Sequence, residues 1–438
     1  MKKSILFLPL LAFTSLASLT GCSDGKIHVK FWHTMGKDKM DLLDRMIEKF
    51  NEKYPDVKID HGNQGDYTAL YEKLTQSIPA GKMPQMAFCY PDHVADYNVN
   101  NAVINVEEYL AKENLAFTQE EGLVSDFVET YWQEGKEYSK AGTYSVPFAK
   151  STEVLFYNKT FFDTYHLTVP TTWDEMWAVC AEIKALNQAN NLGLEYPLGY
   201  DSDSNLFITL CEQQGIPYTT NEGITKLTDH VQFNNDQAKA LVSDLKAKID
   251  AGLFITKGCL PEKAYTSTKF TEGSIVMSVG STGGTSYNTT TNFEVAVAPA
   301  PVTNAGDKYI SQGPSVCFFK KGSDAEKEAA WNFYKFITQN YYSAAYGTLS
   351  GYEPVRKSSF ELDSYKEYIA GGSLQAKTSK VTATLEGRYF NSAVFPGSAK
   401  SREEVGNILA NVVKGTKTLE QAFAQAYKNA TDALQEEK

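Results

Sequence analysis

The chain has 438 residues, with 42 Lys and Arg against 53 Asp and Glu, and a net charge of −11. An acidic protein repels nucleic acid phosphates and anionic lipid headgroups, so this charge argues against a nucleic acid partner and against a basic membrane-binding patch. A single hydrophobic core seldom serves so long a chain, and the length therefore predicts two domains.

The first 22 residues have the pattern of an export signal. A basic start and an apolar run precede Leu-Thr-Gly-Cys at 19–22, which resembles the bacterial lipobox. The run is shorter than the roughly 20 apolar residues of a membrane-spanning helix. We therefore expect 1–21 to be a lipoprotein signal peptide and 22–26 a tether. The mature protein would be exported and anchored through a lipid on Cys22 to the bacterial cell membrane, at its outer face or in the periplasm; the alternative is an ordinary signal with a chance cysteine.

The next seventy residues predict strands that alternate with helices. Alternating apolar side chains predict a strand at 27–31, followed by a helix with one apolar face that Asp38 would cap. A second strand is expected at 57–59, and a second helix begins at Asp66. A nearly unbroken apolar run at 86–90 is typical of a buried parallel strand. This order indicates an α/β fold.

Four later helices are predicted to begin at capping boxes, in which a Ser or Thr and a Glu or Gln three residues later satisfy each other's backbone amides. The boxes start at Thr172, Ser323, Ser401 and Thr418. The Gly-, Ser- and Thr-rich stretch 280–292 predicts a loop, and the last third of the chain is expected to be helical. Further strands are predicted at 144–148, 154–157, 274–279, 293–298 and 315–319.

Six cysteines are scattered along the chain without paired spacing. If Cys22 carries a lipid, an odd number remains. Cys89, Cys180 and Cys317 lie in apolar runs, where a cysteine is usually a small buried hydrophobe. We expect free thiols and no disulfide framework, with a single pair as the alternative.

Motifs of common enzyme classes are missing from the sequence. It has no G-x-S-x-G elbow, no H-E-x-x-H pair, no Walker A loop and no G-x-G-x-x-G turn. A serine hydrolase, a zinc site and a nucleotide site by those routes therefore have no support, and we expect neither a metal nor a cofactor.

One partial match to a calcium loop needs a decision. Asp201, Asp203 and Glu212 have the spacing of EF-hand ligands, but Leu206 stands where that loop requires glycine. A helix capped by Asp203 or Ser204 is the better interpretation.

Several short stretches carry a resemblance to a known family, and the order of the set is more specific than any one of them. They are Phe31 to Met35, Gly65 to Tyr67, Ala80 to Pro84, Asp96-Tyr97, Pro147 to Thr152, Leu155 to Lys159, Gly313 to Ser315 and Ser350 to Val355. Together they resemble the family 1 extracellular solute-binding proteins of ABC importers, and within that family the glycerol-3-phosphate-binding branch. The resemblance covers nearly the whole mature chain.

The resemblance implies an α/β protein with a two-lobed, periplasmic-binding-protein-like fold of type II, like that of maltose-binding protein. Such receptors close by a hinge over a ligand in the cleft between the lobes. Lobe 1 would comprise 27–146 and 313–352, and lobe 2 would comprise 147–312 and 353–438. The chain would then cross the hinge more than once.

Matching positions imply a set of ligand-binding residues. Arg402 would hold a phosphate with its bidentate fork, and Tyr352 would pack on a glycerol or sugar. Arg402 could instead be a solvated surface charge, Tyr67 could belong to the core, and Gly313 could simply make a turn. The full set is Trp32, Tyr67, Asp92, Ser151, Ser281, Gly313, Tyr352 and Arg402.

Two departures from the family pattern affect the ligand. Lys150 stands where the family has a second hydroxyl beside Ser151, and it would either add a phosphate contact or face water. The segment 205–207 reads Asn-Leu-Phe, where glycerol-phosphate binders carry tryptophan. Trp32 and Asp92 would serve a sugar equally well.

The function implied by the resemblance is transport. We expect a monomeric, lipid-anchored substrate-binding protein, with no catalysis of its own, that delivers sn-glycerol-3-phosphate or a glycerophosphodiester to ABC permease subunits. A receptor of the same family for a sugar or oligosaccharide is the first alternative. A secreted glycan-degrading enzyme, which would need two carboxylates facing one cleft, and a surface adhesin are alternatives of other classes.

Overall fold

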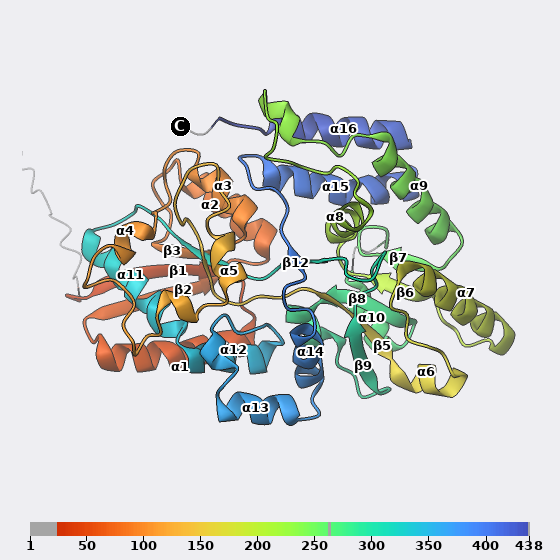
Figure 1. The fold of residues 1–438 in the computed structure, drawn as a ribbon, viewed down its shortest axis with the longest axis horizontal. Helices are drawn as coiled ribbons and strands as arrows, with labels where there is room; N and C mark the ends of the chain where they lie inside the picture. The colour runs from red at the N-terminus through yellow and green to blue at the C-terminus, as the bar shows by residue number, and fades with distance from the viewer. Residues whose placement is uncertain (1–23, 262–263, 437–438) are drawn as a thin grey trace, which may run out of the picture.

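The computed structural model describes residues 24–261 and 264–436, so the predicted signal peptide and Cys22 lie outside the described residues. Figure 1 shows two α/β bodies side by side, each built on a sheet that helices cover. The two large sheets have five strands each, and β12 of a separate two-stranded sheet lies at the centre of the view. The predicted two-lobed α/β fold is confirmed.

The first sheet has the strand order β2-β1-β3-β11-β4. β1 pairs in parallel with β2 and β3, whereas β11 is antiparallel to both β3 and β4. A strand from late in the chain therefore completes a sheet that begins at residue 27. The strands are β1 (Ile27–His33), β2 (Val57–Asn63), β3 (Met86–Cys89), β4 (Val146–Pro147) and β11 (Ser315–Phe318). The helices of this body are α1 (Lys37–Lys53), α2 (Tyr67–Ser77), α3 (Pro91–Asn98), α4 (Glu107–Leu110), α5 (Glu129–Glu134), α11 (Asp324–Ile337) and α12 (Asn340–Ser350).

The second sheet has the order β7-β6-β8-β5-β9, with β6 parallel to β7 and β8 and with β5 antiparallel to β8 and β9. Its strands are β5 (Glu153–Asn158), β6 (Tyr196–Tyr200), β7 (Phe254–Thr256), β8 (Ile275–Ser281) and β9 (Val295–Pro299). The helices beside it are α6 (Lys159–Tyr165), α7 (Trp173–Asn190), α8 (Asp203–Gln214), α9 (Asp236–Asp250), α10 (Thr266–Glu272), α14 (Leu374–Ala383), α15 (Ser398–Val413) and α16 (Leu419–Asp432). Helix α13 (Asp363–Ala370) precedes α14, and short 3-10 helices lie at Val124–Asp126, Leu227–His230, Thr282–Asn288 and Lys357–Ser359.

The segments that pass between the two bodies are hydrogen-bonded to one another, and we call them the crossing region: 146–153, 311–315 and 351–355. Ser151 exchanges backbone hydrogen bonds of 2.9 and 2.8 Å with Gln312. Lys150 exchanges backbone hydrogen bonds of 3.2 and 2.6 Å with Glu353. Beside them β10 (Tyr309–Ile310) pairs in parallel with β12 (Tyr389–Phe390). The three segments at the boundaries of the two expected lobes therefore lie together.

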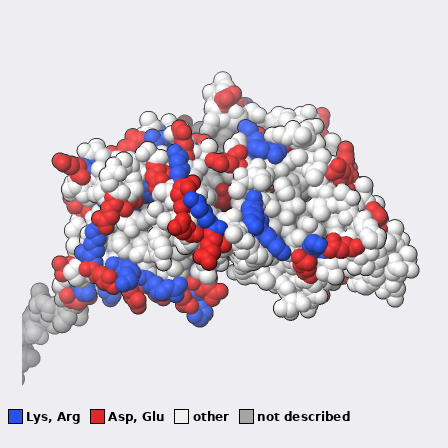
Figure 2. Space-filling model, turned by 60° about the horizontal axis from the view of Figure 1, so that its bottom comes forward, with Lys and Arg blue, Asp and Glu red and all other residues white. Residues whose placement is uncertain are grey.

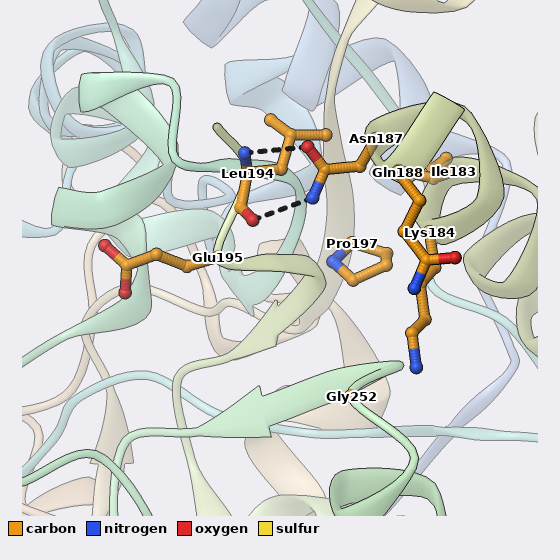
Figure 3. Close-up of a pocket in the computed structure, with 8 residues that line it drawn as sticks. All are labelled: Ile183, Lys184, Asn187, Gln188, Leu194, Glu195, Pro197 and Gly252. Atoms are coloured by element: carbon orange, nitrogen blue, oxygen red, sulfur yellow. Dashed lines mark hydrogen bonds between the residues drawn. The ribbon is translucent and has the colours of Figure 1, made fainter. Parts of the chain in front are cut away.

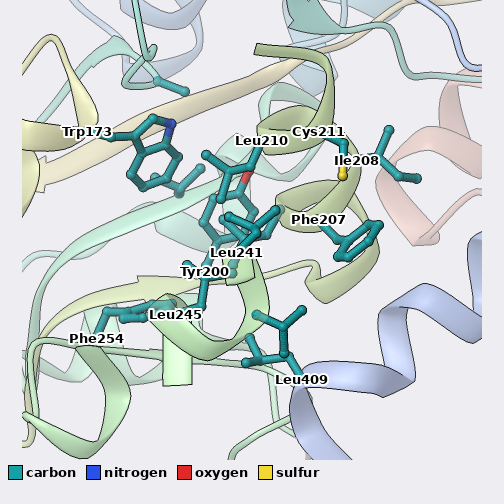
Figure 4. Packing of buried hydrophobic residues seen from close by; sticks show 14 of the residues in the cluster. Trp173, Tyr200, Phe207, Ile208, Leu210, Cys211, Leu241, Leu245, Phe254 and Leu409 are labelled. Carbon is teal, nitrogen blue, oxygen red and sulfur yellow. The ribbon is translucent and has the colours of Figure 1, made fainter. Parts of the chain in front are cut away.

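Each body has its own hydrophobic core. The core of the first body contains Phe31 of β1, Phe88 of β3 and Trp331 of α11, all almost completely buried. In the second body, Figure 4 shows Tyr200 and Phe254 of the sheet beneath α7, α8 and α9, with Leu409 of α15 at the edge of the same cluster. Because the two cores are separate, each sheet is stabilised by its own helices.

Helix starts follow the predicted capping chemistry in most places. The boxes at Thr172, Ser323 and Thr418 are present with both reciprocal hydrogen bonds, and Asp66 caps α2 through the amide of Ala69. The predicted box at Ser401 is wrong: α15 begins earlier, after Gly397, and Ser401 is a buried residue of its first turn.

Two other predicted caps are also wrong. Helix α1 starts one residue before Asp38 with Gly36 as its N-cap. Ser202, rather than Asp203 or Ser204, caps α8 by accepting from the amide of Asn205. In both helices the extended N-cap residue comes earlier in the chain than the polar side chain that suggested the start.

The predicted strands lie at the expected positions, but their lengths differ from those expected. The strand expected at 144–148 is reduced to β4 because its flanking residues bond to other segments: Phe148 donates to Pro314 and Tyr144 donates to Gly135. The stretch 280–292, expected as a loop, contains the end of β8 and a 3-10 helix that Ser281 caps.

The described cysteines, Cys89, Cys180, Cys211, Cys259 and Cys317, are free and buried, as the apolar runs predicted for three of them. Across the described residues, no helix combines the length and apolarity that a membrane crossing requires. On the face seen in Figure 2, acidic and basic side chains are interspersed.

Candidate functional site

A stack of aromatic rings lines the end of the first sheet. Tyr67, the first residue of α2, stacks on Tyr90, which follows β3, with ring centroids 4.2 Å apart. His93 of α3 lies 5.3 Å from Tyr90 and 4.7 Å from Tyr71. Burial raises the pKa of Tyr67 well above its ordinary value, so the phenol stays neutral.

Asp92 stands in the first turn of α3, just beyond the carboxyl end of β3, where α/β sheets place ligand contacts. Its Oδ1 accepts a 3.0 Å bond from the amide of His93. Burial lowers the pKa of His93, and the carboxylate of Asp92 opposes that shift. Asp92 is thus an anionic group beside the rings of Tyr90 and His93.

Ser151, Ser281 and Gly313 meet in the crossing region. The hydroxyl of Ser281, at the end of β8, donates to that of Ser151 at 3.3 Å. Gly313 has φ of +104°, and a Cβ there would lie 2.4 Å from the carbonyl oxygen of Ala149. Glycine is therefore required at 313 both for its backbone conformation and for the close approach of the two segments.

Tyr352 lies against the second body. A Cβ added to Gly283 would fall 2.3 Å from the ring carbon Cζ of Tyr352, so the ring rests on bare backbone there. The ammonium group of Lys39, from the first turn of α1, lies 5.4 Å from the centre of the same ring. Burial raises the pKa of Tyr352 to about 12, and burial lowers the pKa of Lys39.

Arg402 projects from the first turns of α15, half-buried. Its Nη2 donates to Oδ1 of Asn205, a buried residue of α8. Nδ2 of Asn205 donates at 2.9 Å to Oε1 of Glu153, and the hydroxyl of Tyr200 donates to the other oxygen of Glu153. In residues 24–261 and 264–436, no carboxylate lies within ion-pair distance of Arg402. Its described hydrogen-bond partner is therefore a neutral amide.

Tyr90 links these groups. Besides the stack on Tyr67, its hydroxyl lies close enough to Tyr352, Arg402 and Asp92 for each of them to affect its pKa, which burial raises. Tyr90 is therefore in contact with Tyr67 and within electrostatic range of Tyr352, Arg402 and Asp92.

Trp32 is placed differently from the other seven candidates. Its half-buried ring is covered by the ammonium group of Lys73 of α2, 4.3 Å from the ring centre. In the sheet its backbone lies between Gly62 and Ala87. The contacts of Trp32 in the described structure therefore belong to the first body.

Lys150 corrects a sequence-based expectation. It neither faces water nor points to a phosphate: it is 2% exposed and forms an ion pair with Glu134 of α5. The carboxylates of the partial calcium loop are likewise engaged, Asp201 with Thr266 at 2.6 and 2.7 Å and Asp203 with the amide of Gly258 at 2.7 Å. Among the described residues, no group of three metal-ligating side chains is present.

Two cavities lie in the second body. The smaller, of 140 Å³, is shown in Figure 3 between α7 and the start of β6, where the amide of Asn187 brackets the backbone of Leu194. None of the candidate residues lines it. The larger, of 290 Å³, lies between the end of α8 and the segment 390–393 and includes Tyr218, a hydroxyl near both Arg402 and Asp92. None of the candidate residues lines the larger cavity either.

Sequence reasoning missed four residues of this region. Lys39 was hidden because its helix start was misplaced, and Tyr90 was counted only as part of an apolar strand. Glu153 and Asn205 are far apart in sequence and meet Arg402 only through packing of β5, α8 and α15. The one sequence signal that pointed to these residues was the absence of tryptophan at 205–207.

Two α/β bodies joined by several crossing segments are the architecture of a receptor that closes on a small solute. The chain belongs to the family of bacterial extracellular solute-binding proteins, whose model matches residues 45–371. It is the substrate-binding protein of an ABC import system and has no enzymatic activity of its own, as the sequence predicted.

Curated relatives show the branch to which the chain is similar. It is 26% identical over 351 residues to the sn-glycerol-3-phosphate-binding periplasmic protein UgpB of Yersinia pestis, covering 76% of this chain and 75% of the relative. Identity to the protein of that name in Escherichia coli (strain K12) is 24% over 358 residues, covering 79% and 78%.

Solved structures support the same fold. UgpB from Mycobacterium tuberculosis, in complex with glycerophosphocholine, has a TM-score of 0.76 at 18% identity, covering 94% of this chain and 98% of that one. The GacH receptor of Streptomyces glaucescens, solved with acarbose, scores 0.74 at 18% identity, covering 94% and 99%. Maltose-bound MalE3 of T. maritima scores 0.74 at 17% identity, covering 93% and 100%.

Proposed function

We propose that the protein binds sn-glycerol-3-phosphate or a glycerophosphodiester and delivers it to a membrane permease. The observation that carries this proposal is the guanidinium of Arg402, which has no carboxylate partner among the described residues, beside neutral hydroxyl groups. A phosphate is the ligand chemistry that a guanidinium without a carboxylate partner matches best. Relatives named for glycerol-3-phosphate binding, and a solved relative with glycerophosphocholine, support the same chemistry.

Each remaining candidate has a role in this proposal. Ser151 and Ser281 hydrogen-bond to phosphate or glycerol oxygens, and Gly313 lets the backbone approach the ligand. Tyr67 and Tyr352 pack on the glycerol carbons, with Trp32 at the margin. Asp92, beside Tyr90 and His93, accepts from glycerol hydroxyls or faces a quaternary ammonium group, a cation that aromatic rings also favour.

The mechanical part of the proposal is closure of two lobes. We assign 27–146 with 313–352 to lobe 1 and 147–312 with 353–438 to lobe 2, so that the crossing region acts as the hinge. The protein acts as a monomer held at the bacterial cell membrane by a lipid on Cys22, which keeps it close to the permease that it serves.

A sugar is the second candidate ligand. The absence of tryptophan at 205–207 and the aromatic stack next to Asp92 favour it, because sugars are held by aromatic stacking and carboxylate hydrogen bonds. The solved relatives with acarbose and maltose support this alternative.

Calorimetric titration separates the two ligands. The protein should bind glycerophosphocholine or sn-glycerol-3-phosphate and should not bind maltose. Arg402→Ala should weaken that binding by roughly 10- to 100-fold, since a hydrogen bond to a charged group contributes ~1.5–3 kcal/mol. Lys428→Ala, which removes an exposed charge on α16, is the matched control and should bind normally. Binding of maltose alone would overturn the phosphate assignment.

A further inference from the structure

Arg402 is hydrogen-bonded to buried Asn205, which is in turn hydrogen-bonded to buried Glu153. Asn205 is 5% exposed and Glu153 is 3% exposed. Asn205 accepts from Arg402 on one side of its amide and donates to Glu153 on the other. The second oxygen of Glu153 accepts from Tyr200, so both carboxylate oxygens are occupied.

We propose that Glu153 and Asn205 are positioning residues that fix the guanidinium of Arg402 for anion binding, through a side-chain relay from β5 to α8 to α15. The proposal rests on the proposed role of Arg402 in holding a phosphate. It assigns a purpose to the departure at 205–207, because the asparagine there supplies an acceptor that tryptophan lacks.

The position of Glu153 couples the relay to the rest of the site. In the second sheet it stands directly opposite Ser281 and two residues after Ser151, the two candidate residues whose hydroxyl groups are hydrogen-bonded to each other. A free arginine side chain loses much rotamer entropy when it binds, and a guanidinium already held by Asn205 has lost part of it beforehand. The relay therefore improves affinity by preorganisation.

Glu153 also carries a charge that depends on pH. Burial raises the pKa of Glu153 to about 7, while hydrogen bonds from Tyr200 and Asn205 and the charge of Arg402 act to lower it. Asp201, which follows β6, raises it. These groups, from β6, α8 and α15, are those that face the carboxyl group.

The sign of the linkage follows from this arrangement. A bound anion repels the ionised carboxylate and so favours protonated Glu153, which means that binding takes up a proton. Affinity for an anion should fall as pH rises through about 7. A ligand without an anionic group, such as maltose, has no such repulsion with Glu153 and should show no such dependence.

The test uses glycerophosphocholine, since its phosphodiester does not titrate between pH 6 and 8. Its dissociation constant should rise severalfold over that range for the unaltered protein. Glu153→Gln should bind at pH 8 as the unaltered protein does at pH 6, with a flat profile. Asn205→Ala should weaken binding about tenfold both at pH 6 and at pH 8, the equivalent of ~1.4 kcal/mol. Lys428→Ala should keep the normal profile.

The outcomes separate this inference from the proposed function. If Arg402→Ala binds normally, the proposed ligand contact fails. If Arg402→Ala loses binding while Glu153→Gln and Asn205→Ala keep the normal affinity and pH profile, the relay is wrong and the proposed function stands.

A second measurement needs no ligand, so the relay can still be tested if one of the variants above does not fold. The Nε resonance of Arg402, assigned by its loss in Arg402→Ala, should shift with a midpoint near pH 7 in the unaltered protein and stay constant in Glu153→Gln. A constant resonance in the unaltered protein would overturn the relay.

Discussion

The backbone amide of Gly397 donates a 2.6 Å hydrogen bond to Oδ1 of Asp96, which joins the start of α15 to α3 across the two bodies. The other oxygen of Asp96 accepts at 2.7 Å from Tyr71 of α2. This contact lies away from the crossing region, so any separation of the two bodies there must break it. Asp96 therefore links α3 of the first body to α15 of the second, and we call this link the clasp.

The first prediction concerns this clasp. Asp96→Asn replaces a carboxylate by an amide, so the hydrogen bonds of Gly397 and Tyr71 lose a charged acceptor, at a cost of ~1–3 kcal/mol. The ligand-free protein should become more open, with a larger radius of gyration in small-angle X-ray scattering, while saturating ligand restores the compact value. An unchanged radius in both states would show that the clasp does not hold the bodies together.

The second prediction concerns pH. Burial raises the pKa of Asp96 to about 6, above its ordinary value of 3.8. The charge of Asp92 also raises this pKa, whereas the hydrogen bonds from Tyr71 and Gly397 lower it. A carboxyl whose pKa is raised by folding contributes more stability when protonated, and that contribution is lost as pH rises from about 4 to about 6. The stability difference between the unaltered protein and Asp96→Asn should therefore decline over this window, by a few kcal/mol at most. Urea unfolding at pH 4.5 and 7 measures it, and a difference that grows with pH would contradict it.

The third prediction concerns Gly313. Gly313→Ala should lower the melting temperature by more than Gly306→Ala does. Both glycines have a positive φ, of +104° and +96°, but only Gly313 has backbone atoms within contact distance of the added Cβ. The strain of positive φ costs roughly 1–2 kcal/mol at either site, and the clash adds to it at 313. Equal shifts in a thermal melt would mean that the segments can move apart freely.

The fourth prediction concerns the buried pair of Lys150 and Glu134. Lys150→Met leaves Glu134 unpaired and should destabilise the protein by ~3–5 kcal/mol in urea unfolding. Lys150→Met combined with Glu134→Leu should recover most of that loss. Lys159→Met, which breaks an exposed pair with Asp163, is the control and should change stability little.

The fifth prediction concerns Lys39, which faces Tyr352 from α1. Lys39→Gln should weaken glycerophosphocholine binding about fivefold, or ~1 kcal/mol, because it removes a half-buried positive charge beside the candidate site. Lys37→Gln, two residues away and paired with Asp41 at the surface, should leave the affinity unchanged. A loss of affinity that is equal for both variants would point to a general field effect of net charge.

Local features of this fold were predictable because they depend on neighbouring residues. The β-α-β opening and the caps at Asp66 and Thr172 follow from spacing and from side chains within four positions of one another. Ser401 shows the limit: the box is present in sequence, but Gly397 and the bond to Asp96 start the helix earlier.

Long-range contacts of the site could not be read from spacing. Asn205 and Arg402 are 197 positions apart, and Asp96 and Gly397 are 301 apart. Family resemblance supplied Arg402 and Tyr352 as candidates, but the link from Arg402 through Asn205 to Glu153 depends on packing of α15, α8 and β5, which are far apart in sequence. The burial of Lys150 was missed for the same reason, since Glu134 approaches it only in the folded protein.

The placement of β11 between β3 and β4 has a consequence for the order of synthesis. The central pairing of the first sheet is incomplete until residues 315–318 have left the ribosome. A nascent chain of three hundred residues therefore cannot finish the sheet that it began first. Until then the edges of β3 and β4 that pair with β11 stay open, so the first body is completed after every strand of the second sheet has been made.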